Sequence, residues 1–560
     1  MPLLVANVKL SGEFPTDDAL RTVVSRHLGV APNRVTEVTL VRRSLDGRAR
    51  TPAWRGNLRV TLDHGEGEIL ARTIAGVRGF TDRDEARLSG SFPVPEGLRW
   101  TSRPIVIGAG PAGLFAALRL GEAGASAILL ERGQAVEGRI PAVNGFWRGG
   151  PIDPDNNILF GEGGAGTFSD GKIYTRRRDG ELGYIFKTLV ESGADPGILQ
   201  EGWAHLGTDK VRAILPALRK KIRDTGVEIR FGAVVEDLLV EDGVCVGVRL
   251  RGGEEVRGGP VIVAAGHSAR DTMEALLRAG VAAEVRPIAI GARIEHPQAL
   301  VDSAKYPSGR GELPPASYRL TDTPTEGRAA YTFCMCPGGM VVPAQEQAGR
   351  IVVNGMSFAA RRAMWANSAL IVQVGADDYG ADDPLAGVRF QEALEQRAFA
   401  MTGDRYLAPM QRVNDFLAGR PSTDLPRTSY PFGGVPCDLA ELFPAGVVEG
   451  MKRAIRAFDA DVPGFAGPEG VLIAPETRTT SPVRFLRTPS LESPSLPGVL
   501  PCGEGAGWAG GIVSAALDGY RCAEAIIARV NTPAQRTEAD SPLLRSPLHD
   551  LRSVAHGNLP

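Results

Sequence analysis

Residues 1–80 show short runs in which apolar and polar positions alternate, separated by runs with helical spacing. LLVANVKL at 3–10 alternates as a half-buried strand does, and Thr16 is placed to cap the amphipathic run that follows it. The predicted elements are a strand at 3–10, a helix at 17–29, strands at 35–41 and 57–63, and a helix at 68–77. This βαββα order predicts a small ferredoxin-like α+β module.

Two stretches near this module lack an apolar pattern. RRSLDGRAR at 42–50 places four arginines near a turn, and we interpret it as a solvated hairpin tip in preference to a binding patch. Residues 81–100 are polar and contain proline and glycine, which indicates a linker. At the other end of the chain, residues 531–560 are rich in Pro, Ser and Arg without periodicity and are expected to form a loosely ordered tail.

A second domain begins with a buried strand, IVI at 105–107, that runs into the glycines of a G-x-G-x-x-G fingerprint. Gly108 allows the tight turn, Gly110 lets a pyrophosphate approach the backbone, and Gly113 lets the following helix pack on the strand. A further apolar strand ends at Glu131, which is placed to accept hydrogen bonds from an adenosine ribose. Strand, helix, strand and acid together predict a dinucleotide site at a helix N-terminus.

Two later segments favour FAD over NAD(P). Residues 226–266 have the pattern of a strand, a hairpin meander and a strand ending in glycine, and residues 498–526 have that of a strand, a glycine-rich turn and a helix. Two-dinucleotide-fold flavoproteins return in this way to close over the flavin; the alternative for 498–526 is a packing turn before a core helix. A helix starting near Gly511 would favour negative charge on the flavin. The predicted FAD-binding residues are Gly108, Gly110, Pro111, Ala112, Gly113, Glu131, Arg132, Gly163, Gly164, Val235, Ala265, Gly266, Gly503, Glu504, Gly511 and Ile512.

The segment GEGGAGTFSDGK at 161–172 matches a phosphate-binding P-loop from Gly166 to Lys172 but lacks the last residue of that motif. Ile173 stands where such a loop needs Ser or Thr for Mg²⁺, so we do not interpret the segment as a triphosphatase motif. We expect its glycines to let the backbone pass against the flat flavin ring. Lys172 is then either a charge facing the substrate or flavin edge, or a solvated side chain.

Several sequence blocks resemble one known family. They are FGEGGAGTFSDGK (160–172), GHSARD (266–271), FCMCPGG (333–339), VVNGMS (352–357), ANSAL (366–370), ETRTTSPVR (476–484) and GEGAGWAGGI (503–512). The chain, apart from its tail, resembles the poorly characterised bacterial FAD-dependent dehydrogenases of the glutathione-reductase-like flavoprotein superfamily. The departures are slight: Trp508 stands where Tyr is usual, and Thr480 where Ser is usual. The resemblance implies a flavoprotein oxidoreductase and leaves its substrate open.

Candidate substrate-site residues come from three motifs. The first is segment 161–172, which contains Lys172. Cys334 and Cys336 stand two apart, which on a strand would turn both thiols to one side; we interpret them as packing or wall residues in preference to a redox pair. Arg478 and Arg484 precede the return segment and either clamp an anionic substrate group or form structural ion pairs. His267 is expected to cap a helix or line the cofactor site, and no metal cluster is predicted.

Composition narrows the function further. The net charge of −2 argues against nucleic acid as a partner, and no apolar stretch is long enough to span a bilayer. Six cysteines form no disulfide framework, and the start lacks a signal-peptide pattern, so we expect a cytoplasmic protein. No second nucleotide fold is visible, which leaves the electron partner open among NAD(P), a quinone, O₂ and a protein.

These patterns predict an α/β protein in which a two-dinucleotide-binding-type FAD domain is interrupted by an α+β substrate domain. The predicted parts are the ferredoxin-like module at 1–80, a linker at 81–100, the FAD domain at 101–285, a substrate domain at 286–465, a return segment at 466–530 and a tail at 531–560. The expected activity is an FAD-dependent dehydrogenase or reductase that moves hydride between a small organic substrate and flavin N5. The alternatives are a flavin monooxygenase and an RNA-associated flavoprotein.

Overall fold

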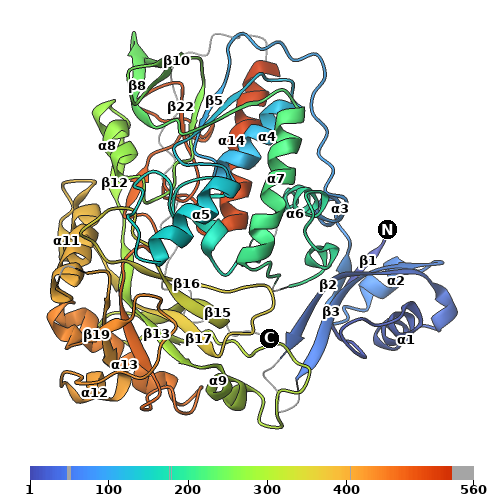
Figure 1. Cartoon of the computed structure of the whole chain (residues 1–560). Helices are drawn as coiled ribbons and strands as arrows, with labels where there is room; N and C mark the ends of the chain where they lie inside the picture. Colours follow the sequence, from blue (N-terminus) through green and yellow to red (C-terminus); the bar gives the residue numbers. More distant parts are fainter. Residues whose placement is uncertain (47–51, 176, 178, 203, 404, 532–560) are drawn as a thin grey trace.

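The N-terminal module is an antiparallel sheet with two helices. The computed structural model describes residues 1–46, 52–175, 177, 179–202, 204–403 and 405–531 (Figure 1). The sheet order is β2-β3-β1-β4. Its elements are β1 (Leu3–Lys9), α1 (Asp17–Leu28), β2 (Val35–Asp46), β3 (Ala53–Leu62), α2 (Glu66–Ala71) and β4 (Val77–Gly79). Thr16 caps α1 as predicted, because its hydroxyl accepts a hydrogen bond from the Ala19 amide at 3.3 Å.

Two expectations about this region need correction. The stretch interpreted as a linker contains α3 (Asp82–Ser89), which Thr81 and Asp84 close with a capping box. The arginine turn is also only partly a solvated tip: Arg43 is buried, and its amide donates to the Gln200 carbonyl at 2.6 Å. Residues 47–50 of that turn lie outside the described residues, as does the expected tail from 532 onward.

The fingerprint region forms a five-stranded parallel sheet of order β22-β11-β5-β6-β7. Its strands are β5 (Ile105–Ile107), β6 (Ile128–Glu131), β7 (Glu228–Phe231), β11 (Val261–Val263) and β22 (Val499–Pro501). On one face Val106 and Leu129 pack against helices; on the other Ile105 and Leu130 pack toward the β8–β10 meander. Both faces are therefore buried, which explains why these strands are continuous apolar runs.

Helices cover one face of this sheet, among them α4, which begins at the fingerprint glycines. Figure 1 shows α4, α14 and α7 side by side, and α4 packs closely against both α14 and α7. The helices on this face are α4 (Pro111–Glu122), α5 (Val136–Trp147), α6 (Leu182–Glu191), α7 (Thr208–Asp224) and α14 (Ile512–Asn531). Helix α8 (Arg270–Arg278) lies on the opposite face, where Met273 and Leu276 pack in the core beside the meander. The meander strands are β8 (Val235–Glu241), β9 (Val244–Leu250) and β10 (Glu255–Arg257). A strand from the far end of the chain, β22, lies beside β11, so the return segment joins the first sheet.

The middle of the chain builds a second, mostly antiparallel sheet of order β14-β15-β17-β13-β20-β18-β19, with β16 paired to β15. Its strands are β13 (Ile288–Pro297), β14 (Thr321–Asp322), β15 (Ala330–Pro343), β16 (Val353–Met356), β17 (Trp365–Val374), β18 (Ala408–Arg412), β19 (Gly434–Pro436) and β20 (Val471–Glu476). Helix α13 (Ala445–Phe458) packs on β17 and α11 (Ala386–Met401) on β18 and β20. Because β20 pairs with β13, this sheet extends beyond the expected boundary at residue 465.

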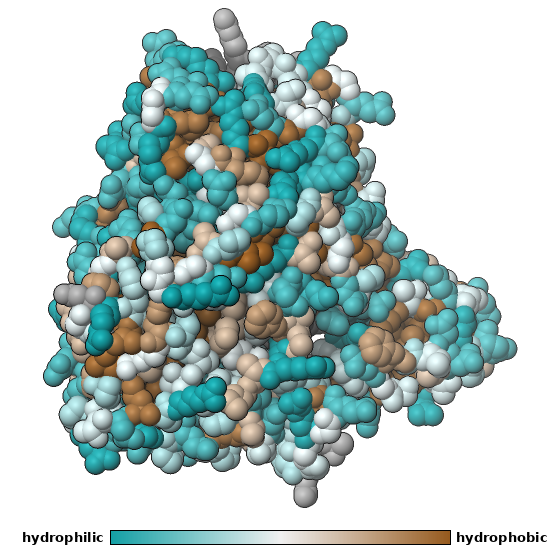
Figure 2. All heavy atoms as spheres, in the orientation of Figure 1, coloured by the Kyte–Doolittle hydropathy of each residue, from teal (hydrophilic) through white to brown (hydrophobic). Residues whose placement is uncertain are grey.

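Smaller elements complete the described chain. They are α9 (Gln298–Lys305), α10 (Ala376–Tyr379), α12 (Val413–Ala418) and the paired strands β12 (Ala283–Val285) and β21 (Val483–Phe485). Figure 2 shows hydrophilic residues over most of the visible face, with hydrophobic residues in separated groups. Within the described residues, none of the helices combines the length and apolar character that crossing a membrane requires.

Candidate functional site

The turn from β5 into α4 is shaped by three glycines. Gly108 has φ +96°, and a Cβ there would lie 2.5 Å from the Ala264 carbonyl oxygen. A Cβ at Gly113 would lie 1.8 Å from the Gly108 carbonyl oxygen, so only glycine fits both positions. Gly110 is different, because its Cβ would meet only the Gly164 Cα at 3.8 Å. The backbone at Gly110 is therefore open to a ligand at the N-terminus of α4.

Glu131 ends β6 and is buried beside this turn. Its carboxylate accepts hydrogen bonds from the amides of Ala109 at 2.6 Å, and of Gly133 and Gly161 at 2.9 Å each. A carboxylate has about four lone-pair sites, so one remains for a ribose hydroxyl. Arg132 instead pairs with Asp271 at 2.8 Å, and its guanidinium lies over an aromatic ring.

The glycine-rich segment 161–172 lies between the N-termini of α4 and α14. Gly164 would place a Cβ 3.1 Å from the Gly110 Cα, and Gly166 would place one 3.0 Å from Ile512. The Gly163 amide donates to the Ala109 carbonyl at 2.8 Å. The segment continues as a 3₁₀ turn at Gly164–Phe168, and the described residues between α5 and this segment form no strand. A P-loop requires a strand before it and an α-helix after it, so this geometry agrees with rejecting that interpretation.

The return segment completes the junction. A Cβ at Gly503 would lie 3.0 Å from the Ala112 Cβ, and one at Gly505 would lie 2.5 Å from Gly266. Gly511 has φ +84° and open space where a side chain would stand. We call the place where the α4 turn, segment 161–166 and residues 503–512 meet the glycine junction. Its exposed backbone and two helix N-termini fit a dinucleotide with a negatively charged pyrophosphate.

The remaining residues predicted to bind the cofactor have other surroundings. Val235 is buried in the apolar core beneath the meander, while Ala265 is half-buried beside it. Glu504 accepts a long hydrogen bond from the Gly511 amide at 3.5 Å, and its carboxylate lies 3.9 Å from His267. His267 contacts the Arg478 carbonyl at 3.1 Å, and burial lowers its pKa. His267 thus lines the junction between the two sheets.

Beyond the glycine junction, the same segment reaches a buried charged cluster around Asp170. Asp170 is fully buried, and its carboxylate lies 3.1 Å from the Lys172 ammonium and 3.4 Å from Arg361. It also accepts a hydrogen bond from Ser357 and lies 3.5 Å from His205. Burial would raise the pKa of Asp170, but Lys172 and the other partners lower it below its usual range. The carboxylate is therefore ionised and fixes the position of Lys172.

A second group, which we call the cation–thiol cluster, consists of Lys172, Arg293, Cys334 and Cys336. Lys172 donates to the Met335 carbonyl, between the two cysteines. Arg293 donates to the Cys334 carbonyl at 2.9 Å and to the Cys336 sulfur at 3.6 Å. No sequence motif had pointed to Arg293, which is fully buried on β13. Its guanidinium lies beside Gly355, where a Cβ would be only 2.1 Å away.

The expected arginine pair does not form. Arg478 is buried and pairs with Glu395 at 2.8 Å and with Glu346, so it is held by structural ion pairs. Arg484 instead lies over the Trp508 ring at 5.0 Å and 3.7 Å from Glu284. The two guanidinium groups have different partners, and the acids that neutralise Arg478 come from segments too distant in sequence to be anticipated.

Three potential metal ligands also lie together, although no cluster was expected. Atoms of Cys502, Asp518 and Cys522 lie within 4.8 Å of one another. Asp518 already pairs with Arg487 at 3.0 Å and accepts from the Gly503 amide at 2.7 Å. The arginine charge opposes a cation there, so we assign no metal to this group.

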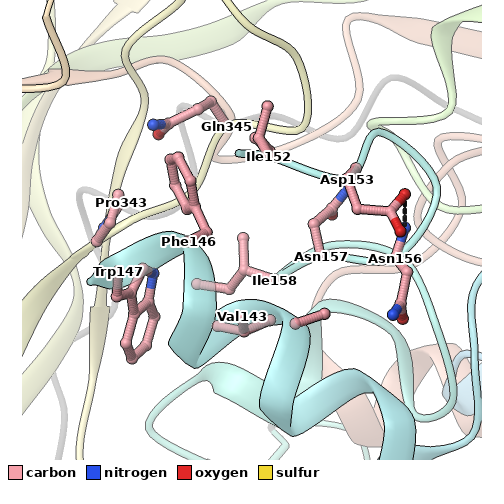
Figure 3. Close-up of a pocket in the computed structure, with 11 residues that line it drawn as sticks. Val143, Phe146, Trp147, Ile152, Asp153, Asn156, Asn157, Ile158, Pro343 and Gln345 are labelled. Carbon is pink, nitrogen blue, oxygen red and sulfur yellow. Dashed lines mark hydrogen bonds between the residues drawn. The ribbon is translucent and has the colours of Figure 1, made fainter. Parts of the chain in front are cut away.

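Two small pockets flank these sites. One of them, shown in Figure 3, is bordered by Phe146, Trp147 and Ile158 together with Gln345. Neither the Gln345 amide nor the Trp147 indole nitrogen has a hydrogen-bond partner within the described part of the chain. The other pocket lies beside Gly266 and Gly505, next to the glycine junction.

The comparisons with known proteins agree with this geometry. Residues 103–153 match the FAD binding domain family, and residues 287–479 match the family described as FAD-dependent protein, C-terminal domain-like. A protein of Clostridium beijerinckii, described as uncharacterized, is 37% identical over 548 residues, covering 95% of this chain and 100% of the relative. The fold and site therefore define an FAD-binding protein. The chain belongs to the same family as the C. beijerinckii relative, and its cofactor is FAD.

Solved structures are similar only at low identity. A flavin-dependent brominase, Bmp2, in a triple-mutant form matches with a TM-score of 0.35 and 14% identity over 77% of this chain and 81% of its own. The glycerol-3-phosphate dehydrogenase of Bacillus halodurans, complexed with FAD, matches with a TM-score of 0.33 and 12% identity over 82% of this chain and 70% of its own.

Proposed function

We propose that the protein is an FAD-dependent oxidoreductase, a dehydrogenase or reductase acting on a small organic substrate. The observation that carries the proposal is the glycine junction, where three segments far apart in sequence expose backbone around two helix N-termini. FAD, when bound, supplies a hydride acceptor or donor at flavin N5. The residues at the junction bind and orient it, with the N-terminus of α4 toward the pyrophosphate and that of α14 toward the charge of reduced flavin.

We assign the FAD contacts to the glycine junction and its borders. Glu131 keeps one acceptor site for the ribose, and Gly110 and Gly164 leave room for the pyrophosphate. Val235 is buried in apolar surroundings, as Ala112 is, and stays a proposed contact through its backbone. The proposed contacts are Gly108, Gly110, Pro111, Ala112, Gly113, Glu131, Arg132, Gly163, Gly164, Val235, Ala265, Gly266, Gly503, Glu504, Gly511 and Ile512.

The substrate is proposed to carry an anionic group that approaches Lys172 and Arg361. Both side chains are partly exposed, at 22% and 20%, whereas their shared partner Asp170 is fully buried. Burial raises the pKa of nearby Glu476 to about 7, although Arg293 opposes this, so that carboxyl offsets little of the positive charge below neutral pH. The balance of charge at this end of segment 161–172 therefore favours an anion.

Two finer assignments complete the proposal. We infer that the N-terminal sheet is a ferredoxin-like module and that the FAD domain is of the glutathione-reductase-like type with an inserted second domain, which the strand orders support. We also infer a cytoplasmic location, since the six cysteines are free thiols.

The test uses purified protein and a matched pair of valine variants. Gly110→Val should abolish FAD binding, because the branched side chain would occupy the place of the pyrophosphate. Gly145→Val, on α5 with nothing within 4 Å of its Cβ, should retain FAD. A Gly110→Val protein with full FAD occupancy would refute the cofactor assignment.

Anaerobic bleaching of the bound flavin across a panel of small acids and their neutral analogues tests the reaction. Lys172→Met should lower substrate-driven bleaching by roughly tenfold, the loss of one charge-assisted contact. Lys220→Met, which removes an exposed lysine on α7, should bleach as the unaltered protein does. Bleaching by neutral and acidic substrates alike, unaffected by Lys172→Met, would contradict an anionic substrate at this lysine.

A further inference from the structure

The two cysteines of β15 lie together in a backbone arrangement that a regular strand would not give. The pairing of β15 with β17 shifts register on both sides of Cys336, and Cys334 has φ +46°. The Cys336 sulfur lies 3.2 Å from the Cys334 carbonyl oxygen as a hydrogen-bond donor. A positive φ is uncommon for cysteine, and such residues concentrate at functional sites.

The surroundings distinguish the two thiols. Cys334 is partly exposed, whereas Cys336 is fully buried beneath it. A hydrogen bond from the Cys336 thiol, together with the charges of Lys172 and Arg293, lowers the pKa of Cys334 to about 6. Burial and the same hydrogen bond raise the pKa of Cys336 well above its ordinary value. One thiol is thus accessible and favoured as thiolate, and its neighbour is a protonated thiol.

We propose that Cys334 and Cys336 form a two-electron thiol–disulfide couple, in which Cys334 attacks a small disulfide and Cys336 resolves the product. This departs from the packing role that the sequence favoured. The packing interpretation accounts for Cys336 alone, since it gives no reason for two cations to converge on the backbone and sulfur of this pair. The inference does not rest on the proposed oxidoreductase activity, because the exchange with a disulfide needs neither the substrate of that reaction nor reduced flavin.

The exchange balances in two steps. The Cys334 thiolate attacks one sulfur of R–S–S–R, the S–S bond breaks, and RS⁻ leaves as the Cys334–S–S–R mixed disulfide forms. The Cys336 sulfur then attacks the Cys334 sulfur, a Cys334–Cys336 disulfide forms, and the second RS⁻ leaves with the proton that Cys336 gives up. The protein pair is oxidised by two electrons and R–S–S–R is reduced to two thiols. An external dithiol reverses the reaction.

The experiment uses the FAD-bound full chain and dithiodipyridine as the disulfide probe, followed by intact-mass spectrometry. The unaltered protein should release two thiopyridines and lose about 2 Da, the two hydrogens removed when a disulfide forms. Cys336→Ser should stop at the mixed disulfide and keep one thiopyridine. Cys334→Ser should react at least tenfold more slowly, because the buried Cys336 lacks the stabilised thiolate.

Cys437→Ser is the matched control, because Cys437 is another partly exposed thiol and burial raises its pKa to about 12. It should react as the unaltered protein does. Flavin absorbance and thermal unfolding of every variant show whether the fold is retained.

Lys172→Met adds a measurement whose result would not change if the two cysteines only packed. The pH midpoint of the reaction rate should rise by roughly one unit, since a neighbouring positive charge is lost. Lys172→Arg should restore it. Two outcomes would overturn the proposal: a probe that stays on Cys334 of the unaltered protein without release of the second thiol, or a Cys334→Ser protein that reacts as fast as the unaltered one.

Discussion

At the scale of single residues, buried charged side chains with several partners lie where the two sheets meet. Glu395 is fully buried and lies 2.9 Å from Arg270 on α8 and 2.8 Å from Arg478 after β20. Burial alone would raise the pKa of Glu395, but Arg478 and Arg270 lower it below its usual range. The carboxylate is therefore ionised at all ordinary pH values, and its two arginines come from different domains.

Arg478→Met should destabilise the protein by about 3–5 kcal/mol, because it leaves Glu346 without its main partner and Glu395 with only one of two. Arg484→Met is the control, with an expected loss below about 1 kcal/mol, since the Arg484 side chain is 30% exposed. Urea unfolding followed by circular dichroism measures both. If Arg478→Met kept its stability and lost only substrate-driven flavin reduction, the substrate-clamp interpretation would regain its support.

Glu295 on β13 should make stability depend on pH. Burial raises its pKa to about 7 from an ordinary 4.5, although Ser429 donates to it through both its amide and its hydroxyl. A carboxyl whose pKa is raised by folding contributes fully below pH ~4.5, and this contribution is lost as the pH rises through ~7. The contribution of Glu295 to the free energy of unfolding that is lost over this pH range is about 3 kcal/mol.

Glu295→Gln should therefore flatten the fall in unfolding free energy between pH ~5 and ~8, because a neutral amide has no proton to lose. Glu449→Gln, at an exposed position on α13, should leave the curve unchanged. Urea unfolding at several pH values measures the slopes. Parallel curves for the unaltered protein and Glu295→Gln would show that this carboxyl does not titrate as inferred.

At the scale of elements, the success of sequence-based prediction depended on how local the determining contacts are. The β5–α4–β6 unit could be predicted because its apolar runs and glycines are contiguous. Helix α3 could not, because DRDEARLS has no buried residue and only its capping box marks the start. The position of β20 in the second sheet was not predicted, because it depends on pairing with β13, which is distant in sequence. Gly291 of β13 lies opposite Glu476 of β20.

The candidate site divides in the same way. The glycine junction was largely anticipated, since each of its segments carries its own glycine pattern. The cation–thiol cluster was not, because Lys172, Arg293 and Cys334 come from three separate elements and only the fold brings them together. Its single local signal was the CxC spacing, which by itself does not distinguish packing from chemistry.

The crossing of α14 and α4 is an element-scale feature that glycine makes possible. A Cβ at Gly519 would lie 1.9 Å from the Ala112 carbonyl oxygen, at the first turn of α4. Gly519→Ala should push the helices apart, cost about 1–3 kcal/mol and weaken FAD binding, since α4 and α14 both begin at the glycine junction. Gly145→Ala, a helical glycine with open space, should instead stabilise by up to about 1 kcal/mol. Denaturant unfolding measures stability and FAD titration measures cofactor affinity in both variants. Unchanged FAD affinity in a destabilised Gly519→Ala protein would show that the α4–α14 crossing does not affect FAD binding.

At the scale of the whole molecule, the N-terminal module projects from the side of the FAD domain (Figures 1 and 2). Two sets of contacts between described residues attach it there. Helix α3 contacts α6, where a Cβ at Gly183 would lie 2.3 Å from the Arg87 carbonyl oxygen. The β2–β3 hairpin forms the second attachment, with backbone hydrogen bonds from Arg43 to Gln200 and from Gly202 to Arg43. The module is therefore held in a fixed orientation by contacts at both of its ends.

Arg43 joins the second attachment with its side chain as well as its backbone. The guanidinium is only 4% exposed, lies 3.4 Å from Glu201 and 4.0 Å from the centre of the Phe14 ring, and donates to the Glu13 carbonyl. Arg43→Ala should therefore open the hairpin contact while α3 stays docked. Amide hydrogen exchange at residues 43 and 202 should accelerate by about tenfold, as expected when a local contact worth about 1.4 kcal/mol is lost.

Arg59→Ala is the matched control, because Arg59 lies on β3 of the same sheet and pairs within the module, at 2.9 Å from Glu37. It should leave exchange at residues 43 and 202 unchanged. Equal exchange in both variants would mean that the backbone hydrogen bonds alone hold the hairpin. Acceleration throughout residues 1–46 in Arg43→Ala would instead mean that this arginine stabilises the module itself. Exchange confined to the hairpin and to segment 200–202 is the outcome expected if Arg43 fixes how the module sits on the FAD domain.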